Sequence, residues 1–324
     1  MALAPADVGQ VVGGDRADEQ HPDRNRGSAH EADSVAQECG HVVSESSQVE
    51  RHAHDDRDAW RVEELAAPLV AQGAKIAGTV AKACLGDAVV TMLANDEAVS
   101  AVALGECGIA ASLPAGAIHI SSSTIGVALS EKLTTAHAEA GQRYVAAPVF
   151  GRPEAAAKKL LFIVAAGEDG AVKAAQPLFD AMGQKTFLVS KTPKDANLVK
   201  LSGNFLIAAV IESLGEAMAL VEKAGVDKRQ YLELLTSTLF SAPVYKTYGT
   251  LIADRAFEPA GFAAPLGLKD IRLALAAAEE LRVPLPLASL LRDRFLALLA
   301  QDGDRLDWSA IGALPAKDAG IASG

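Results

Sequence analysis

The sequence predicts an α/β domain with a mostly parallel sheet, followed by a long connecting helix and an all-helical domain. Three observations predict this order. Between residues 61 and 190, short apolar or β-branched runs alternate with helical runs. From residue 195 onward the runs are helical only. A chain of 324 residues with 50% apolar content is also long enough to form two compact cores.

The elements of the α/β part are read from their apolar patterns and from the Gly, Pro and acidic residues between them. The predicted helices are 61–73, 79–87, 96–113, 125–141 and 168–183. The predicted strands are 74–78, 88–95, 117–124, 143–151, 158–167 and 185–190. Such alternation is typical of a sheet covered by helices on both faces. Ligands of open parallel sheets bind beyond the carboxyl ends of the strands, where the loops 121–124 and 147–154 lie.

The connecting helix is predicted over residues 195–225, where apolar residues recur about one turn apart. Lys200 and Asn204 are four residues apart, so one helix face carries both. At 1.5 Å per residue the run reaches roughly 40 Å, and a helix of that length usually ties two bodies together. The remaining helices are predicted over 227–239, 242–254, 265–282 and 286–301.

Residues 1–60 have a different composition. They hold 13 acidic and 5 basic residues, no lysine and five of the seven histidines, and Leu3 is their only Leu, Ile or Phe. We expect this segment to be disordered, because it has too few large apolar groups to offset its ordering entropy. His52, His54, Asp55 and Asp56 are potential metal ligands, but no periodicity fixes them, so no metal site is predicted.

The net charge of −11, with 30 Lys and Arg against 41 Asp and Glu, argues against nucleic acid or an anionic membrane surface as a partner. No uninterrupted apolar run has membrane length, and the N-terminus lacks the pattern of a secretory signal. The three cysteines form no CxxC pair and no zinc-ligand spacing. We therefore expect a soluble, cytoplasmic protein.

Five motifs in chain order resemble the β-hydroxyacid dehydrogenases. This family includes 3-hydroxyisobutyrate dehydrogenase and glyoxylate or succinic semialdehyde reductases, and it is related to 6-phosphogluconate dehydrogenase. The motifs are 89–96, 121–126, 146–156, 196–204 and 261–278, and the resemblance covers about residues 61–312. It implies an incomplete dinucleotide-binding, Rossmann-like domain over 61–192 and an all-helical dehydrogenase domain over 193–316. It also implies NAD or NADP as cofactor, a small carboxylate substrate, and a homodimer or higher homo-oligomer.

The resemblance assigns roles to individual residues. Lys200 is the implied catalytic lysine and Asn204 its substrate-orienting partner, while Ser123 is an implied substrate contact. Met92, Leu93 and Lys269 are implied cofactor contacts. Seven positions carry or depart from the family pattern in ways that bear on these roles: Ser121 replaces an acid, Ala146, Phe150 and Arg152 differ in the substrate loop, Gly151 is kept, and Lys194 and Ala196 replace glycines.

The chemistry expected of these residues is alcohol oxidation beside a carboxylate, or its reverse. Burial of Lys200 disfavours the charged amine, so its pKa falls from about 10.4, and a nearby Lys269 acts in the same direction. The backbone near Gly151, with Ser123, is expected to hold the carboxylate, and Arg152 offers a bidentate fork. Simpler alternatives remain: Ser123 caps the following helix, Arg152 is a solvated loop charge, or Lys200 lies on a helix surface.

One family feature is missing from the sequence. No Gly-x-Gly-x-x-Gly turn follows an apolar strand, and the glycines of 10–14 precede an acidic run that would repel a pyrophosphate. We hypothesise that residues 1–59 are read from another frame, which leaves the first unit of the domain degraded and cofactor binding weak. Arg61 lies where a family arginine would meet a 2′-phosphate, which favours NADP.

The leading hypothesis is an NAD(P)-dependent oxidoreductase of a small hydroxy acid or the corresponding aldehyde or keto acid. An imine reductase-like enzyme is an alternative, although those relatives generally lack the lysine. The other alternative is a non-catalytic dimeric binding protein that has lost its nucleotide site.

Overall fold

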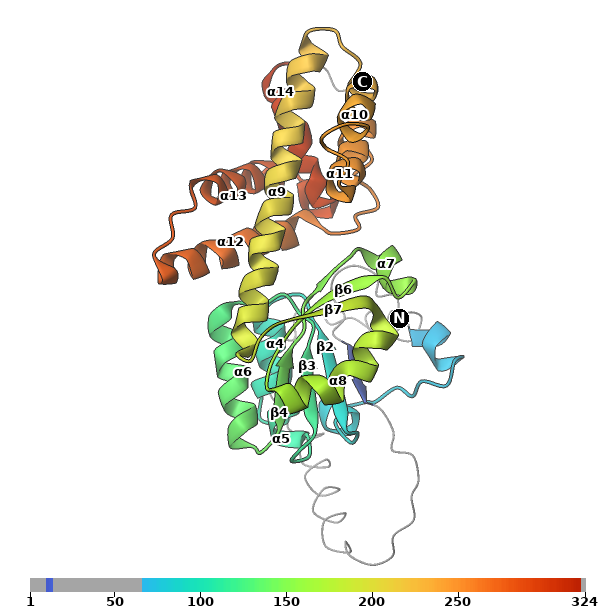
Figure 1. Cartoon of the computed structure of the whole chain (residues 1–324), viewed down its shortest axis with the longest axis vertical. Coiled ribbons are helices and arrows are strands. Elements are labelled where there is room, and N and C mark those ends of the chain that lie inside the picture. Colours follow the sequence, from blue (N-terminus) through green and yellow to red (C-terminus); the bar gives the residue numbers. More distant parts are fainter. Residues whose placement is uncertain (1–9, 14–65, 322–324) are drawn as a thin grey trace, which may run out of the picture.

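The computed structural model describes residues 10–13 and 66–321. Figure 1 shows a sheet domain, a helical domain above it, and one long helix, α9, that runs through both. The predicted fold class, an α/β domain followed by an all-helical domain, is confirmed.

Among the described residues, the sheet has seven strands in the order β1-β2-β3-β4-β6-β5, with β7 beside β6. The strands are β1 Gln10–Gly13, β2 Ala88–Met92, β3 Ile118–Ser121, β4 Arg143–Ala146, β5 Val149–Phe150, β6 Leu161–Ala166 and β7 Gly183–Ser190. β2, β3 and β4 are mutually parallel, as are β6 and β7, whereas β1 and β5 pair antiparallel with their neighbours and β4 meets β6 antiparallel. The sheet is therefore mixed rather than mostly parallel.

Helices cover both faces of this sheet, as predicted. One face packs under α4 Asp96–Leu104, α5 Ile109–Ser112, α6 Val127–Glu139 and the first turns of α9. The other packs under α8 Asp169–Met182. Along β4, Tyr144 and Ala146 point into the first core and Val145 into the second, which is the period of two expected for a strand. Two short helices, α3 Val80–Ala83 and α7 Pro153–Ala157, and a helical turn at 66–70 complete the domain.

The structure corrects three element predictions. Residues 74–78 form no strand; they are irregular and exposed, because the sheet edge beside β2 is already paired with β1. The helix predicted over 96–113 is two helices, interrupted between Gly105 and Gly108. The strand predicted over 143–151 is split at Pro148, which has no N–H to donate. Residues 1–60 were predicted to be disordered, but Gln10–Gly13 form strand β1 because they pair with the edge of β2. The prediction for the other residues of 1–60 falls outside the described residues.

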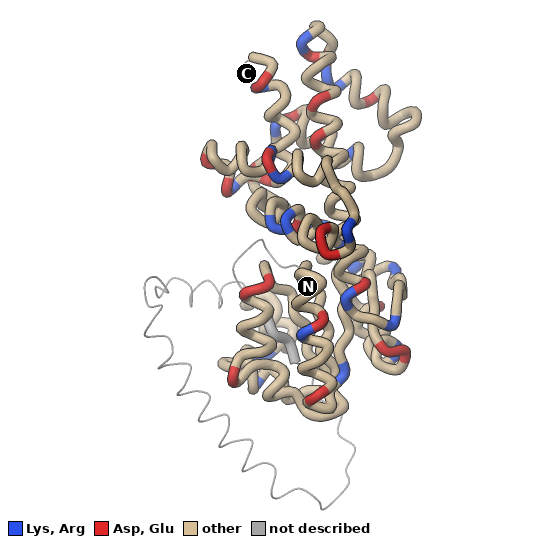
Figure 2. Tube along the Cα trace, turned by 90° about the vertical axis from the view of Figure 1, so that its left-hand side faces the viewer, with Lys and Arg blue, Asp and Glu red and all other residues tan. Residues whose placement is uncertain are grey.

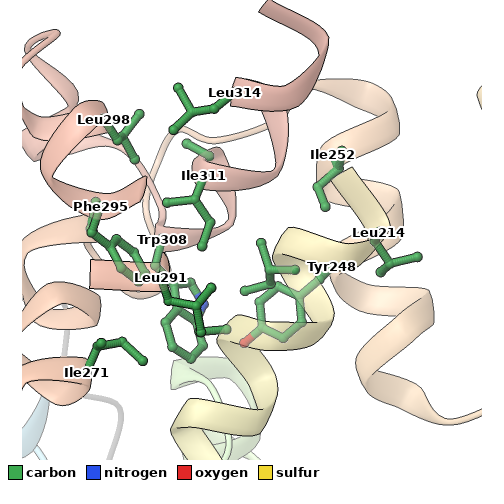
Figure 3. Packing of buried hydrophobic residues seen from close by; sticks show 14 of the residues in the cluster. Leu214, Tyr248, Ile252, Ile271, Leu291, Phe295, Leu298, Trp308, Ile311 and Leu314 are labelled. Atoms are coloured by element: carbon green, nitrogen blue, oxygen red, sulfur yellow. The ribbon is translucent and has the colours of Figure 1, made fainter. Parts of the chain in front are cut away.

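The helical domain is built around the second half of α9, Pro193–Lys223, whose 31 residues span about 46 Å. The other helices are α10 Lys228–Thr236, α11 Pro243–Asp254, α12 Ala264–Leu281, α13 Pro286–Leu299 and α14 Leu314–Asp318, with 3₁₀ turns at Gly303–Arg305 and Trp308–Ala313. Figure 3 shows side chains from these helices meeting in one core, with Trp308 beside Tyr248 and Leu291. The ring of Trp308 meets those of Tyr248 and Phe262 edge to face.

α9 belongs to both cores. Its residue Ala196 packs in the sheet domain, whereas Ile211 and Leu214 pack in the helical domain. Among the described helices, α9 alone has the length and composition that could cross a membrane, yet 44% of its apolar window is buried inside the protein. Together with its buried Lys200, Asn204 and Glu212, this identifies α9 as a core helix that joins two domains.

An ion pair ties the sheet domain to the helical domain. Arg152, just after β5, donates from Nη2 to the Oδ2 atom of Asp307 at 3.0 Å. Asp307 is 1% exposed and also accepts from the backbone N–H groups of Gly261, Phe262 and Ser309 and from the Ser309 hydroxyl. Gly261 leaves the space for the guanidinium, since a Cβ there would lie 1.9 Å from Nη2.

A buried polar chain crosses the first core of the sheet domain. Thr91 Oγ1 lies 2.9 Å from His119 Nε2, His119 Nδ1 lies 2.8 Å from His137 Nε2, and His137 Nδ1 lies 2.6 Å from Gln142 Oε1. Gln142 donates its N–H groups to two backbone carbonyls, so its oxygen must accept from His137. With both histidines neutral, His137 Nε2 accepts from His119 Nδ1 and His119 Nε2 accepts from Thr91, so each ring has one donor and one acceptor nitrogen. Burial lowers the pKa of both rings, that of His119 most strongly.

The interdomain ion pair makes a prediction about stability. Asp307→Ala should lower the free energy of unfolding by about 3–5 kcal/mol, because it leaves the guanidinium and several N–H groups buried without an acceptor. Arg152→Ala should cost less, roughly 1–2 kcal/mol, because the other donors to Asp307 remain. Urea unfolding measures both, and Arg229→Ala in the exposed pair with Asp254 is the control, with a change below about 1 kcal/mol. Equal losses for Asp307→Ala and Arg229→Ala would contradict the assignment.

The histidine chain makes a prediction about pH. The folded-state pKa values are below the unfolded value of about 6.5, so the unfolded chain binds protons first as the pH falls. The stabilisation is complete above pH 6.5 and is lost below it, by up to about 1.4 kcal/mol per pH unit for each ring. The variant with His119→Gln and His137→Gln should show a flatter fall in Tm between pH 6.5 and 5 than the natural chain. Parallel Tm curves for the two proteins would exclude a contribution from these rings.

Candidate active site

The candidate site is centred on the amine of Lys200. Lys200 and Asn204 lie one turn apart on α9 and are 8% and 4% exposed, so Lys200 is not a helix-surface residue. Its Nζ donates a hydrogen bond of 2.9 Å to Asn204 Oδ1. The ring of Phe150, from β5, covers the same amine, with its centroid 4.1 Å from Nζ. The site thus has walls from α9 and from the sheet domain.

A second helix and a sheet loop complete a polar network. Asn204 Nδ2 donates to Oδ2 of Asp270 on α12, and Asp270 is 1% exposed. Lys269 Nζ lies 3.1 Å from the other oxygen of Asp270 and donates to the backbone carbonyl of Thr124 at 2.7 Å. Thr124 follows β3, so hydrogen bonds and ion pairs run without interruption from the carboxyl edge of the sheet to Lys200. This places the buried amine beside the edge where a ligand of such a sheet binds.

The electrostatics of the site bring the pKa of the Lys200 amine down towards physiological pH. Burial lowers the pKa of Lys200 to about 8, the Asp270 carboxylate opposes this shift, and Lys269 adds to it. The first and last of these effects were predicted from the sequence. An amine with such a pKa is present in both protonation states around pH 8, which suits a group that takes up and returns a proton.

The carboxyl ends of the parallel strands lie in line, since Ser121 is in register with both Thr91 and Ala146. Met92, at the end of β2, is 41% exposed, whereas the next residue, Leu93, is buried. The Leu93 N–H donates to Ser123 Oγ at 2.8 Å. Ser123 is fully buried, and the side chain at the N-terminus of α6 is that of Asp96, which accepts from the Gly126 N–H, so the capping alternative for Ser123 is wrong. A substrate contact through Ser123 stays a prediction.

The substrate loop after β5 has two special residues. Gly151 has φ of +144°, a conformation that favours glycine, and a Cβ there would lie 2.7 Å from Leu161 Cδ2. Arg152 is held by Asp307, so it is not a solvated loop charge. The contacts of Gly151 and Arg152 with a substrate carboxylate stay predictions.

The structure brings together Lys200, Asn204 and Lys269, and it adds Asp270, for which the sequence gave no role. The Asp270 carboxylate joins the Asn204 amide to Lys269, and its signal in the sequence was an acid within an otherwise apolar helix face. Phe150, one of the departures from the family pattern, lies with its ring on the Lys200 amine. Asn197 lies one turn before Lys200, is 1% exposed, and has no protein partner for its amide among the described residues.

These residues fit the nicotinamide half of a dinucleotide. Met92 is exposed at the end of β2, and Lys269 binds the loop after β3, so both lie at the edge of the sheet that leads to the Lys200 amine. Arg61 lies outside the described residues. Within 66–321, no three His, Cys, Asp or Glu residues form a group that could hold a metal ion. Figure 2 shows basic and acidic residues interspersed over both domains.

Two family models match successive parts of the chain. The NAD binding domain of 6-phosphogluconate dehydrogenase matches residues 48–190. The NAD-binding domain of NADP-dependent 3-hydroxyisobutyrate dehydrogenase matches residues 195–314. The boundary between them falls at the start of α9, which is the helix that carries Lys200.

Similar proteins agree with these matches. The uncharacterized oxidoreductase YfjR of Bacillus subtilis is 48% identical over 244 residues, which are 75% of this chain and 85% of that protein. The NAD-dependent L-serine dehydrogenase of Pseudomonas aeruginosa is 31% identical over 252 residues, 75% of this chain and 84% of its own. The crystal structure of 3-hydroxyisobutyrate dehydrogenase from Salmonella typhimurium superposes with a TM-score of 0.71 at 26% identity, covering 78% of this chain and 88% of the other. The chain, with its buried lysine at the junction of a dinucleotide-binding domain and a helical domain, therefore belongs to the β-hydroxyacid dehydrogenase family and is 3-hydroxyisobutyrate dehydrogenase-like.

Proposed function

We propose that this protein is an NAD(P)-dependent oxidoreductase that interconverts a small hydroxy acid and the corresponding aldehyde or keto acid. The single observation that carries the proposal is the buried Lys200 amine, hydrogen-bonded to Asn204 and linked to the carboxyl edge of the sheet. A bound nicotinamide would accept the hydride in oxidation and supply it in reduction. The protein's residues then have to position the alcohol and move its proton.

Lys200 performs the proton transfer in this mechanism. In the oxidation direction the neutral amine takes the hydroxyl proton as the hydride leaves the carbon. In the reduction direction the ammonium gives that proton to the carbonyl oxygen. General acid–base assistance of this kind contributes roughly 10²–10⁴ in rate. Since its pKa is about 8, Lys200 serves both directions without a large energetic cost at neutral pH.

Asn204 and Asp270 orient the reacting groups. The side-chain oxygen of Asn204 accepts from the Lys200 amine, and its amide nitrogen donates to the Asp270 carboxylate. Because one partner is a donor and the other an acceptor, they fix the orientation of the amide. Asp270 in turn is held by Lys269, which also binds the loop after β3. A substrate hydroxyl beside this amide meets an amine that is already aligned. Such preorganisation limits the entropy lost on reaching the reactive geometry.

The substrate class is supported by relatives of the chain. They include the L-serine dehydrogenase of Pseudomonas aeruginosa and the 2-hydroxy-3-oxopropionate reductase of Escherichia coli, which is 28% identical over 225 residues. The NADP preference proposed from Arg61 rests on the sequence alone. The homo-oligomer and the cytoplasmic location likewise remain proposals. The buried, hydrogen-bonded amine and the family membership do not favour the non-catalytic alternative.

Turnover should depend on Lys200. Lys200→Ala should lower kcat by about 10²–10⁴ while the affinity for NADPH changes less than about threefold, because the amine acts on the proton and not on the dinucleotide. Initial rates with short 3-hydroxy acids, semialdehydes and glyoxylate, each with NAD and NADP forms, measure kcat, and NAD(P)H fluorescence measures binding. Lys185→Ala, on exposed β7, is the matched control. If Lys200→Ala turned over normally, Lys200 would have no part in the mechanism.

The pH dependence should follow the neighbours of Lys200. For alcohol oxidation, kcat/KM should rise with pH to a plateau above the Lys200 pKa of about 8, because the neutral amine is the base. Asp270→Asn removes a charge that raises this pKa, so the rise should move to lower pH. Lys269→Met removes a charge that lowers it, so the rise should move to higher pH. Shifts of both variants in the same direction would contradict this arrangement.

A further inference from the structure

The aromatic ring over the lysine amine is the feature that the proposed mechanism leaves unused. The centroid of Phe150 lies 4.1 Å from Lys200 Nζ. Gly203, three residues after Lys200 on α9, makes room for it, since a Cβ at Gly203 would lie 2.3 Å from Cζ of the ring. The backbone of Phe150 is held in β5, where it pairs in register with Phe162 of β6. The ring therefore occupies a defined place on the amine.

The ring restricts how a substrate can reach Lys200. An ammonium has three N–H directions, and one of them is used on Asn204 Oδ1. The Phe150 ring covers a second, which leaves one direction for a substrate oxygen. An oxygen hydrogen-bonded there at about 2.9 Å lies roughly 5–6 Å from the ring centroid, given tetrahedral geometry at nitrogen. The substituents of the carbon that bears this oxygen are then within van der Waals reach of the ring.

The cation of the same loop is held by the helical domain, since Arg152 Nη2 donates to Asp307. The side chain of this loop that lies on the amine is therefore the aromatic ring of Phe150. Apolar surroundings distinguish substituents by roughly 10–200-fold for each methylene group, through the apolar surface that they remove from water.

We propose that Phe150 is a specificity-determining residue of this site, and that it selects substrates with an apolar or planar substituent on the carbon that bears the reacting oxygen. This inference rests on the proposed function, because it names the substrate class of the same site. It concerns the alcohol or carbonyl side of the reaction, and the ring itself neither forms nor breaks a bond.

Protection of the Lys200 amine against acylation tests this without turnover. The full chain is treated with acetic anhydride at pH 8, where the amine of Lys200 is about half neutral, and labelling of its peptide is followed by mass spectrometry. The probes are 3-hydroxypropionate and 3-hydroxy-3-phenylpropionate, which share the carboxylate and differ only at the hydroxyl-bearing carbon. We expect the phenyl compound to half-protect Lys200 at a concentration at least tenfold lower.

Variants at position 150 locate the origin of this preference. In Phe150→Ser the two half-protecting concentrations should differ by less than about threefold. In Phe150→Leu, which keeps much of the apolar bulk, their ratio should lie between that of Phe150→Ser and that of the natural chain. Unprotected labelling of Lys200 should rise at least tenfold in Phe150→Ser, because the cover over Nζ is gone. The matched control is Phe187→Ala, which removes an exposed ring 4.6 Å from Lys185 Nζ and should change Lys185 labelling less than twofold.

Each outcome is decisive. Three results would overturn the inference. The ratio of half-protecting concentrations could stay unchanged in Phe150→Ser and Phe150→Leu, or the natural chain could show no preference between the two compounds. Alternatively, neither compound could protect Lys200 at 50 mM, a limit on the order of ordinary weak binding. If Phe150→Ser does not fold, by circular dichroism, Phe150→Leu decides with the same criterion. The preference for the phenyl compound could depend on Phe150 while no hydroxy acid is turned over. That result would contradict the proposed function but support the selection of substrates by the ring.

Discussion

The structure depends on keeping one amine out of water at the junction of two domains. Burial of Lys200 would be costly if its amine had no partner, so the protein supplies Asn204 Oδ1 and an aromatic ring on one side and the Asp270 carboxylate one step further. These groups come from α9, β5 and α12, which no single domain contains. The lowered pKa is therefore a property of the interface between the domains.

The length of α9 is what makes this interface possible. Its first turns pack in the core of the sheet domain and its second half in the helical core, so the residues between them lie where the two bodies meet. The ion pair of Arg152 with Asp307 and the bond from Lys269 to Thr124 connect the same bodies at other points. Because several links of different chemistry fix one geometry, a small rotation of either domain would disturb the surroundings of the Lys200 amine.

The loop after β5 shows how the site can be changed without a change of fold. Phe150 and Arg152 both depart from the family pattern, and each has acquired a protein partner: the ring covers Lys200 and the guanidinium binds Asp307. Gly203 and Gly261 provide the space that these larger side chains need. Hence the two departures are paired with small residues on the other domain, and pairings of that kind appear only when distant segments are placed together.

The sequence by itself determined the succession of an α/β part, one long helix and a helical part, the family, and the placing of Lys200 and Asn204 on one helix face. Helical spacing and motifs are local properties of the chain. It also indicated the direction in which burial moves the lysine pKa. It could not show that 74–78 forms no strand, that Arg152 is held by Asp307, or that Phe150 lies on the amine. The first of these facts depends on the pairing of β1 with β2 inside the sheet domain. The other two depend on contacts between residues 50 and 155 positions apart, which only the packing of the two domains decides.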